Sequence, residues 1–424
     1  MVKEFLDWFL KFASDCESGV DLIHAYMNYL NEIGFLITRG NFGTRTLHPQ
    51  VETMAYLWVP KGKEPLLYTQ PDPLFFSTTV FPYENGSVKV SKFKVGSLAS
   101  NQFTTSPIQY VLSTKNTYYF SFLDHNGVDY PYPILKELAD STPTAYFAVP
   151  VVQAGNSYAF LSLVTEKPFG FTKEEKDFLS ASLSVLSLKM MTFLQYDLTK
   201  TLLGIYLGKT TGERVSSGKI HRGNLEEITS VIWFSDIRNY SGISELLSPQ
   251  EIVDLLNTYF GLVIPVIEEM GGEVLKLLGD GILAVFPYQT KNQKRVGYQA
   301  LIAVRKVFRN LMLLNRKRAT ENKIPIEHGV GLHLGTIRYG NIGSEDRLDF
   351  TVIGEAVNLA SRIAGMCGQL KKAVLSSERF AEQIGVSWED LGEHKLKGIQ
   401  KDQRIYAIPE VEVEREWQNT VKGN

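Results

Sequence analysis

The feature that most constrains the fold is a pair of apolar, β-favouring runs that each deliver an acid. The run TSVIWFSD (229–236) ends at Asp236, and the run EVLKLLGDGILAVF (273–286) is interrupted by Asp280 in the turn GDG. β-branched and aromatic residues favour strands, and a short glycine-containing turn between two such runs favours a hairpin. We therefore predict a strand over 229–236 and a β-hairpin over 273–286 with Asp280 at its tip.

A long helix is predicted between these two elements. Ser248 is a good N-cap, Pro249 suits the first helical position, and Glu251 completes a capping box. The helix pattern ends at Gly271-Gly272, because glycine commonly follows a helix C-terminus. A strand, a helix and a returning hairpin can place the two acids side by side at one edge of a sheet.

Two neighbouring carboxylates repel each other unless a cation lies between them. Hard oxygen ligands at such a place suit Mg²⁺ or Mn²⁺. Taken singly, Asp236 is more simply read as a turn cap and Asp280 as part of a type I′ turn. Taken together with the residues below, they favour a metal site.

A second polar pattern lies in RLDFTVIGEAVNLASR (347–362). An alternating strand reaches Gly354, and a helix is predicted to start near Glu355. Asn358 and Arg362 are four residues apart, so they project from one face of that helix near its N-terminal end. An amide and a guanidinium there suit phosphate or an oxyanion, although such a pair alone is usually part of a solvated face.

Composition predicts a cytoplasmic protein of more than one domain. A chain of 424 residues is too long for one ordinary core. Its formal net charge of −2 does not favour binding to nucleic acid or a membrane surface. Cys16 and Cys367 lie far apart, which gives no disulfide framework and no cysteine metal site. The amphipathic N-terminus is unlike a signal peptide, and we expect no apolar run to cross a membrane.

Changes in pattern mark the domain boundaries. The first segment alternates short β-like runs with turns and flanking helices, which predicts an antiparallel sheet in an α+β domain. Thr172 and Glu175 form a capping box that starts the next segment, a long helix. The predicted segments are the sheet domain at 1–171, the helix at 172–207, a connector at 208–224, a second domain at 225–410 and a charged tail at 411–424.

The helix at 172–207 carries an apolar stripe at spacings of four and three. Its members are Leu179, Leu183, Leu186, Met190 and Phe193, followed after a slip by Leu194, Leu198, Leu202 and Ile205. Such a stripe can be a parallel dimer seam. Alternatively, its first half packs on the sheet of its own domain.

The motifs FSDIR, KLLGDG, VIGEAVNLASR and HKLKGIQ occur in an order and spacing that resemble the class III adenylate and guanylate cyclase catalytic domain. The resemblance covers about 225–410 and implies a ferredoxin-like βαββαβ core. It also implies that Asp236 and Asp280, with the backbone carbonyl of Ile237, hold two Mg²⁺ or Mn²⁺ ions. Asn358 would orient the ribose, and Arg362 would stabilise charge on the α-phosphate.

The resemblance further implies which residues bind the base and the terminal phosphates. Lys276 only donates, which suits adenine N1, and the hydroxyl of Thr351 can accept from the exocyclic amine, so ATP is the expected substrate. Lys397 would bind the terminal phosphates. Gly329 departs from the pattern, because some relatives have a phosphate-binding arginine there, and one phosphate contact is therefore in doubt.

In the family, the metal-binding acids come from one subunit and the nucleotide-binding groups from the other. A single chain that carries both sets implies a homodimer with two composite sites. The product would be 3′,5′-cyclic AMP, with pyrophosphate released.

The N-terminal domain resembles a GAF-type sensor less specifically. The resemblance implies that it regulates the second domain by binding an unknown small molecule, or that it simply dimerises. Two alternatives to an adenylate cyclase are a diguanylate cyclase, suggested by GGEV at 271–274, and a non-enzymatic partner-binding platform. The first is disfavoured because Gly271-Gly272 are predicted to end a helix. The complete set of candidate residues disfavours the second.

Overall fold

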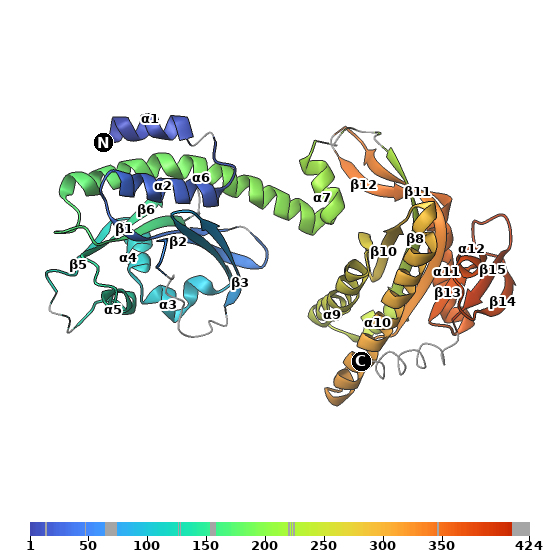
Figure 1. The fold of residues 1–424 in the computed structure, drawn as a ribbon. Coiled ribbons are helices and arrows are strands. Elements are labelled where there is room, and N and C mark those ends of the chain that lie inside the picture. The colour runs from blue at the N-terminus through green and yellow to red at the C-terminus, as the bar shows by residue number, and fades with distance from the viewer. Residues whose placement is uncertain are drawn as a thin grey trace. The chain divides into compact units, whose positions relative to one another are not determined.

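The structure is a computed structural model that describes residues 1–12, 15–46, 48–63, 74–125, 127, 129–152, 158–218, 221, 223, 225–345 and 347–408. The chain divides into two compact units, Met1–Leu202 and Leu203–Asn424, and each is considered by itself (Figure 1). The predicted tail at 411–424 lies outside the described residues.

The described part of the N-terminal unit is built on a seven-stranded sheet in the order β3-β4-β2-β1-β7-β6-β5, with antiparallel pairing throughout. Its strands are β1 (Ile37–Arg45), β2 (Val51–Pro60), β3 (Phe75–Tyr83), β4 (Gly86–Lys94), β5 (Tyr118–Ser121), β6 (Ala145–Val152) and β7 (Tyr158–Thr165). Its helices are α1 (Val2–Phe12), α2 (Gly19–Glu32), η1 (Ser97–Ala99), α3 (Asn101–Thr104), α4 (Pro107–Thr114) and α5 (Pro133–Ala139), followed by α6 (Lys173–Leu207). This confirms the predicted antiparallel α+β domain.

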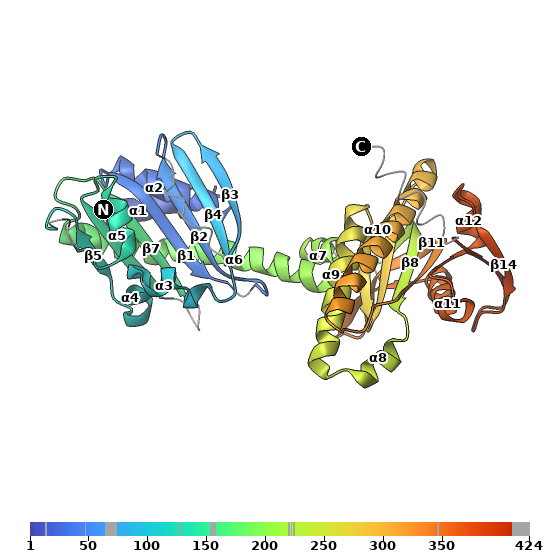
Figure 2. The same ribbon diagram turned by 90° about the horizontal axis from the view of Figure 1, so that it is seen from below.

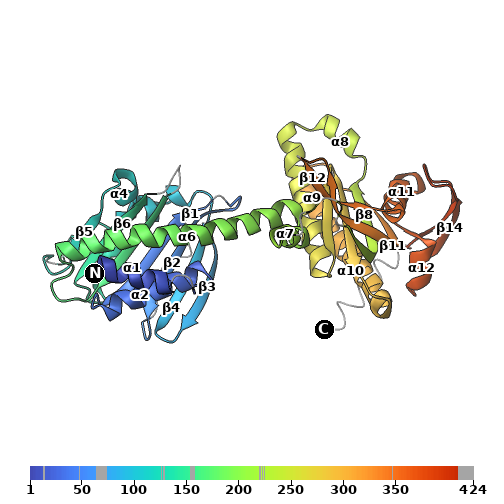
Figure 3. The same cartoon turned by 90° about the horizontal axis from the view of Figure 1, so that it is seen from above.

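Helices cover both faces of this sheet (Figures 1 and 3). On one face, α1, α2 and the first half of α6 bury Phe5, Tyr26 and Leu183 against the strands. On the other face, α4 and α5 bury Val111 and Leu138. The sheet is therefore the middle layer of three.

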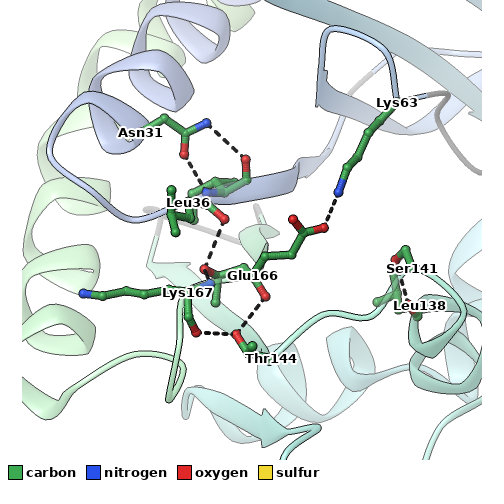
Figure 4. A network of polar contacts seen from close by, with 10 residues as sticks. Asn31, Leu36, Lys63, Leu138, Ser141, Thr144, Glu166 and Lys167 are labelled. Carbon is green, nitrogen blue, oxygen red and sulfur yellow. Dashed lines mark hydrogen bonds and ion pairs between the residues drawn. The ribbon is translucent and has the colours of Figure 1, made fainter.

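Polar contacts bind the start of β1 to α2, and others bind the end of β7 to the residue before β6 (Figure 4). The Asn31 amide accepts from the Ile37 backbone N–H at 2.5 Å and donates to the Ile37 carbonyl at 3.1 Å. The Thr144 hydroxyl donates to the carbonyls of Thr165 and Lys167 at 3.0 and 2.7 Å. These bonds satisfy backbone groups where the regular ladder ends.

The capping box at the start of α6 is confirmed. The Glu175 carboxylate accepts from the Thr172 backbone N–H at 2.9 Å, and the Thr172 hydroxyl accepts from the Glu175 N–H at 3.2 Å. The first half of the apolar stripe, through Met190, is buried in the core of its own unit. The dimer-seam interpretation is therefore wrong for this half, and it stays a prediction for residues beyond Met190.

The predicted connector contains a helix, α7 (Lys209–Ser216), which belongs to the C-terminal unit. Thr211 is buried and hydrogen-bonds Tyr339, while Arg214 lies over the Tyr339 ring and pairs with Glu226 at 2.6 Å. The glycine and charged residues of this segment led to its prediction as a connector between the two domains. No local sequence pattern indicates that Tyr339 holds this helix.

Two helices in the described residues, α6 and α9 (Pro249–Glu269), are long and apolar enough to cross a membrane by length and composition. This contradicts the expectation from the sequence that no run would qualify. Both helices nevertheless bury one face in a protein core, α6 through Leu186 and α9 through Tyr259 and Val263. A long, apolar helix of this kind also occurs where a helix packs one face against a sheet in a protein core.

The C-terminal unit is built on an eight-stranded sheet in the order β14-β15-β13-β11-β8-β10-β9, with β12 paired to β11. Its strands are β8 (Leu225–Ile237), β9 (Glu273–Leu278), β10 (Gly281–Pro287), β11 (His328–Gly343), β12 (Leu348–Ile353), β13 (Val374–Ser377), β14 (Glu389–His394) and β15 (Gln403–Ala407). Its further helices are α8 (Tyr240–Leu246), η2 (Thr290–Asn292), α10 (Gln293–Thr320), α11 (Glu355–Leu370) and α12 (Glu378–Gln383). The central order β11-β8-β10-β9, with α9 and α10 as connections, is the predicted ferredoxin-like βαββαβ core.

Opposite faces of this sheet carry different helices (Figures 1 and 2). Helices α9 and α10 pack on Trp233 and Leu332, whereas α11 packs on the face that carries Gly331. A Cβ at Gly331 would lie 2.5 Å from the Ala364 backbone nitrogen, so only glycine allows the helix to approach this closely. Because neighbouring residues of a strand alternate between faces, Asp236 shares the α11 face.

Buried histidines give the C-terminal unit a pH-dependent stability. Burial, with the charge of Arg379, lowers the pKa of His333 from 6.5 to about 4, and its ring contacts the Ser377 hydroxyl at 2.7 Å. Between pH 6.5 and about pH 4 the unfolded chain binds a proton at His333 that the folded chain does not. The free energy of unfolding therefore decreases as the pH is lowered through this range. At pH 5 the cost from His333 alone is about 2 kcal/mol relative to pH 7. Chemical denaturation of the parent and of His333→Gln at both pH values measures it, and an equal pH dependence in the two proteins would contradict this account.

Candidate active site

The structure brings Asp236, Ile237 and Asp280 together at one end of the sheet. Asp236 and Ile237 are the last two residues of β8, and Asp280 lies in the two-residue turn between β9 and β10. Ile282 of β10 pairs with Ser235 of β8, so the hairpin tip reaches the end of β8. The Asp280 carboxylate lies close enough to the Ile237 backbone for that backbone to lower its pKa.

The turn that carries Asp280 is not the type I′ turn considered from the sequence. Gly279 has a φ of 66°, but Asp280 is absent from the described non-glycine residues with positive φ. A type I′ turn needs positive φ at both central residues. The turn therefore has no need of an acid for its own geometry, which leaves the Asp280 side chain available for another purpose.

Burial raises the pKa of Asp280, while hydrogen bonds from its own backbone and from Ile237, together with the Arg238 charge, oppose that rise. Asp236 forms an ion pair with Arg238, and its side chain is 26% exposed. Two partly buried acids thus face one positive group. Additional positive charge at this place would offset the cost of burying the carboxylates.

These ligands fit the predicted cations. The available donors are two carboxylates and a backbone carbonyl, all of them hard oxygen ligands of the kind that Mg²⁺ and Mn²⁺ accept. The described residues contain no group of three or more His, Cys, Asp or Glu that could hold a metal ion. An ion at Asp236 and Asp280 would complete its coordination with substrate and water oxygens, as Mg²⁺ commonly does.

Asp349, an acid that was not predicted from the sequence, connects the strand that carries Lys276 to the strand that carries Thr351. The Lys276 ammonium, on β9, donates to the Asp349 carboxylate, on β12, at 2.5 Å. Thr351 lies two residues beyond Asp349, on the same side of the strand, while Phe350 between them packs into the core. The predicted base-binding lysine and threonine therefore belong to one surface.

Asn358 and Arg362 lie on the outer face of α11, as predicted. Both are exposed, whereas Ala360, Ile363 and Ala364 on the opposite face are buried. Among the described residues, no hydrogen bond or ion pair connects this face with Lys276 or with Asp236 and Asp280, the two candidate metal-binding acids (the metal acids). Within one chain, the candidate groups thus form separate sets.

Lys397 is exposed in the turn that follows β14, and the adjacent Leu396 is buried. Gly398 has a φ of 82°, which suits the turn. Leu396 anchors the segment while the lysine points away from the core. Its assignment to the terminal phosphates stays a prediction.

Residues 223–410 match the family model described as the adenylate and guanylate cyclase catalytic domain. The C-terminal unit is a class III cyclase domain. The GAF-like nature of the N-terminal unit stays a prediction.

Related proteins share the cyclase domain. The chain is 31% identical over 197 residues to the terminal-differentiation specific adenylate cyclase of Dictyostelium discoideum, a match that covers 45% of this chain and 9% of that protein. It is 35% identical over 154 residues to an adenylate cyclase of Anabaena cylindrica, covering 36% of this chain and 30% of that protein. The chain thus spans less than a third of either relative. The crystal structure of the guanylyl cyclase Cya2 is 30% identical, with a TM-score of 0.38, and covers 44% of this chain and 93% of that one.

Sequence reasoning missed Arg238 and a buried hydrogen-bond chain behind the metal acids of the cyclase domain. The Trp233 indole donates to the Ser235 hydroxyl at 2.9 Å, and the Tyr259 hydroxyl contacts His328 at 2.7 Å. Arg238 is visible in the motif FSDIR, directly after the last residue of β8, but its pairing with Asp236 is seen only in the folded chain. The partners of the buried chain are far apart in sequence, so no local signal connects them.

Proposed function

We propose that this protein is an adenylate cyclase that converts ATP to 3′,5′-cyclic AMP and pyrophosphate. The observation that carries the proposal is the meeting of Asp236 and Asp280 at one sheet end in a class III cyclase domain. The relatives from Dictyostelium discoideum, Anabaena cylindrica and Rhizobium meliloti, which are named adenylate cyclases, support it.

The reaction joins the ribose 3′-oxygen to the α-phosphorus. The bond between the α-phosphorus and the oxygen that bridges to the β-phosphate breaks, pyrophosphate leaves, and the 3′-hydroxyl proton is lost. Asp236, Asp280 and the Ile237 carbonyl would hold two Mg²⁺ or Mn²⁺ ions. When bound, the ions lower the pKa of the 3′-hydroxyl and neutralise charge on the leaving pyrophosphate.

The remaining residues orient the nucleotide and stabilise charge. Asn358 would hold the ribose, and Arg362 would donate to the α-phosphate as negative charge develops there. Lys397 would bind the terminal phosphates. Their exposure on one chain, without contacts to the metal acids, supports composite sites in which a second copy supplies the nucleotide-binding set.

Lys276 and Thr351 favour adenine. The lysine can donate to adenine N1, and the threonine can accept from the exocyclic amine, whereas guanine presents a donor at N1 and an acceptor at the neighbouring position. Guanine would thus leave the lysine facing a donor. A mispaired buried donor costs about 1–3 kcal/mol, so we expect a preference for ATP of about 5- to 150-fold.

Turnover of ATP and GTP by the purified chain, side by side with Mn²⁺, tests the reaction and the base preference together. We expect cyclic AMP from ATP, little cyclic GMP from GTP, and no product from Asp236→Asn. A folded, dimeric parent that forms no cyclic nucleotide would refute the proposal. Equal rates with both nucleotides would refute only the assignment of Lys276 and Thr351.

The N-terminal unit would act as a GAF-like sensor in a cytoplasmic enzyme. A cavity of about 190 Å³ lies between its sheet and α4, lined by residues that include Asn41, Phe103 and Tyr146. An apolar cavity of about 150 Å³ is large enough for benzene, so a small molecule can be accommodated. This cavity supports ligand regulation of cyclase activity.

A further inference from the structure

Arg238 follows an unusual path at the edge of the cyclase site. Its backbone N–H donates to the Glu327 carbonyl at 2.9 Å as β8 ends. Its guanidinium then lies over Gly329 of β11, where an added Cβ would be 2.7 Å from Nε and 2.8 Å from Cζ. A Cβ at Gly368 of α11 would lie 3.4 Å from Nη1. The side chain therefore occupies a slot that exists because residue 329 has no side chain.

The guanidinium has unused hydrogen-bonding capacity. One terminal nitrogen, Nη2, pairs with the Asp236 carboxylate. The Nε atom is buried and has no hydrogen-bond partner among the described residues, and the side chain is only 19% exposed. Leaving a buried donor unsatisfied is costly. The other terminal nitrogen, Nη1, makes no hydrogen bond among the described residues, so its N–H groups are available to the acceptor oxygens of a ligand.

The position and charge of the Arg238 guanidinium favour an anionic ligand. Its charge acts on both metal acids, since it pairs with Asp236 and also influences Asp280. It also lines a groove with Asn239, Arg316, Lys371 and Lys372, in which positive side chains outnumber the single acid, Glu327. A planar fork of N–H donors beside a cation site matches the oxygens of a polyphosphate.

We propose that Arg238 is a substrate-binding residue, and that its guanidinium over Gly329 binds the terminal phosphates of the nucleotide. The inference rests on the proposed cyclase function and concerns the contact that Gly329 left in doubt. The arginine reaches this place from β8, the strand beside β11, because residue 329 is glycine. The ion pair with Asp236 holds the guanidinium in place before the phosphates arrive.

Binding of inorganic tripolyphosphate to the full-length chain tests this assignment separately from turnover. Isothermal titration with Mn²⁺ present compares the parent, Arg238→Gln and a control, Arg404→Gln. Arg404 also pairs with an aspartate, Asp390, but lies on β15 outside the site. Losing a charge-assisted hydrogen bond should weaken tripolyphosphate binding by about 10- to 100-fold in Arg238→Gln only.

Titration with Mn²⁺ alone distinguishes phosphate binding from a merely structural ion pair. If Arg238 served only to neutralise Asp236, its loss would tighten Mn²⁺ binding and leave tripolyphosphate binding no weaker than in the parent. That result would overturn the assignment. A parent that binds tripolyphosphate but forms no cyclic nucleotide would instead refute the proposed function.

A positional exchange provides the second test and guards against misfolding. Gly329→Ala keeps the arginine but displaces Nε, so tripolyphosphate binding should weaken while the unfolding midpoint changes little. Arg238→Gly and Gly329→Arg should each bind tripolyphosphate weakly, and the double variant should recover at least about tenfold, because a guanidinium again occupies the slot. A double variant no better than Arg238→Gly, with a parent-like unfolding midpoint, would overturn the proposal.

Discussion

Asp280→Asn should lower cyclic AMP formation by at least about 1000-fold, because a neutral amide cannot replace the carboxylate that we propose holds a divalent ion beside Ile237. The substitution preserves the size of the side chain and should not weaken folding. Burial already raises the pKa of Asp280, so removing its charge relieves a cost. We therefore expect loss of turnover together with an unchanged or higher unfolding midpoint, measured by a product assay and by thermal denaturation.

The matched control is Asp254→Asn, which changes an exposed aspartate on α9. It should retain parent activity and stability. Parent-like turnover in Asp280→Asn would show that the hairpin acid does not hold a catalytic ion. A lower unfolding midpoint in that variant would instead assign Asp280 a structural role.

Mixing two inactive variants should restore activity if the sites are composite. Asp280→Ala destroys the metal-binding set of its own chain, and Asn358→Ala destroys the nucleotide-binding set. After subunit exchange at equal concentrations, half of the dimers contain one copy of each variant, and one of the two sites in such a dimer is intact. The mixture should therefore reach about a quarter of parent activity.

Subunit exchange must be demonstrated independently, for example by energy transfer between labelled copies. If exchange occurs and activity stays at the level of the single variants, each site belongs to one chain. Mixing Asp280→Ala with Asp236→Ala is the matched control, because both changes affect the same set and no dimer contains an intact site.

Local sequence signals predicted the elements that position the metal acids. Ser248, Pro249 and Glu251 marked the start of α9, where both halves of the capping box are present. Glycines marked its end and the hairpin tip, because these places require backbone conformations that other residues avoid. The motif order then indicated the ferredoxin-like core, so the meeting of Asp236 and Asp280 could be predicted.

Features that depend on contacts between distant residues could not be predicted in the same way. The segment of α7 was predicted to be a connector. The contact with Tyr339 that stabilises this helix could not be predicted, since Tyr339 lies more than a hundred residues away. The pairing of Lys276 with Asp349 depends on β12 reaching β9. From the sequence, Gly329 was interpreted as the loss of a phosphate contact. Only the folded chain shows that the Arg238 guanidinium lies over it.

The close approach of α11 to β11 has a consequence for how the enzyme can change. The Ala364 backbone packs directly against Gly331, so the short distance between helix and sheet depends on the absence of a Cβ at residue 331. Even one added methyl group would lift the helix, and the amide and guanidinium on its outer side would be displaced in the same direction. Mutations that enlarge side chains of this strand would thus alter the proposed ribose and α-phosphate contacts jointly, whereas substitutions on the helix itself could adjust one contact without the other.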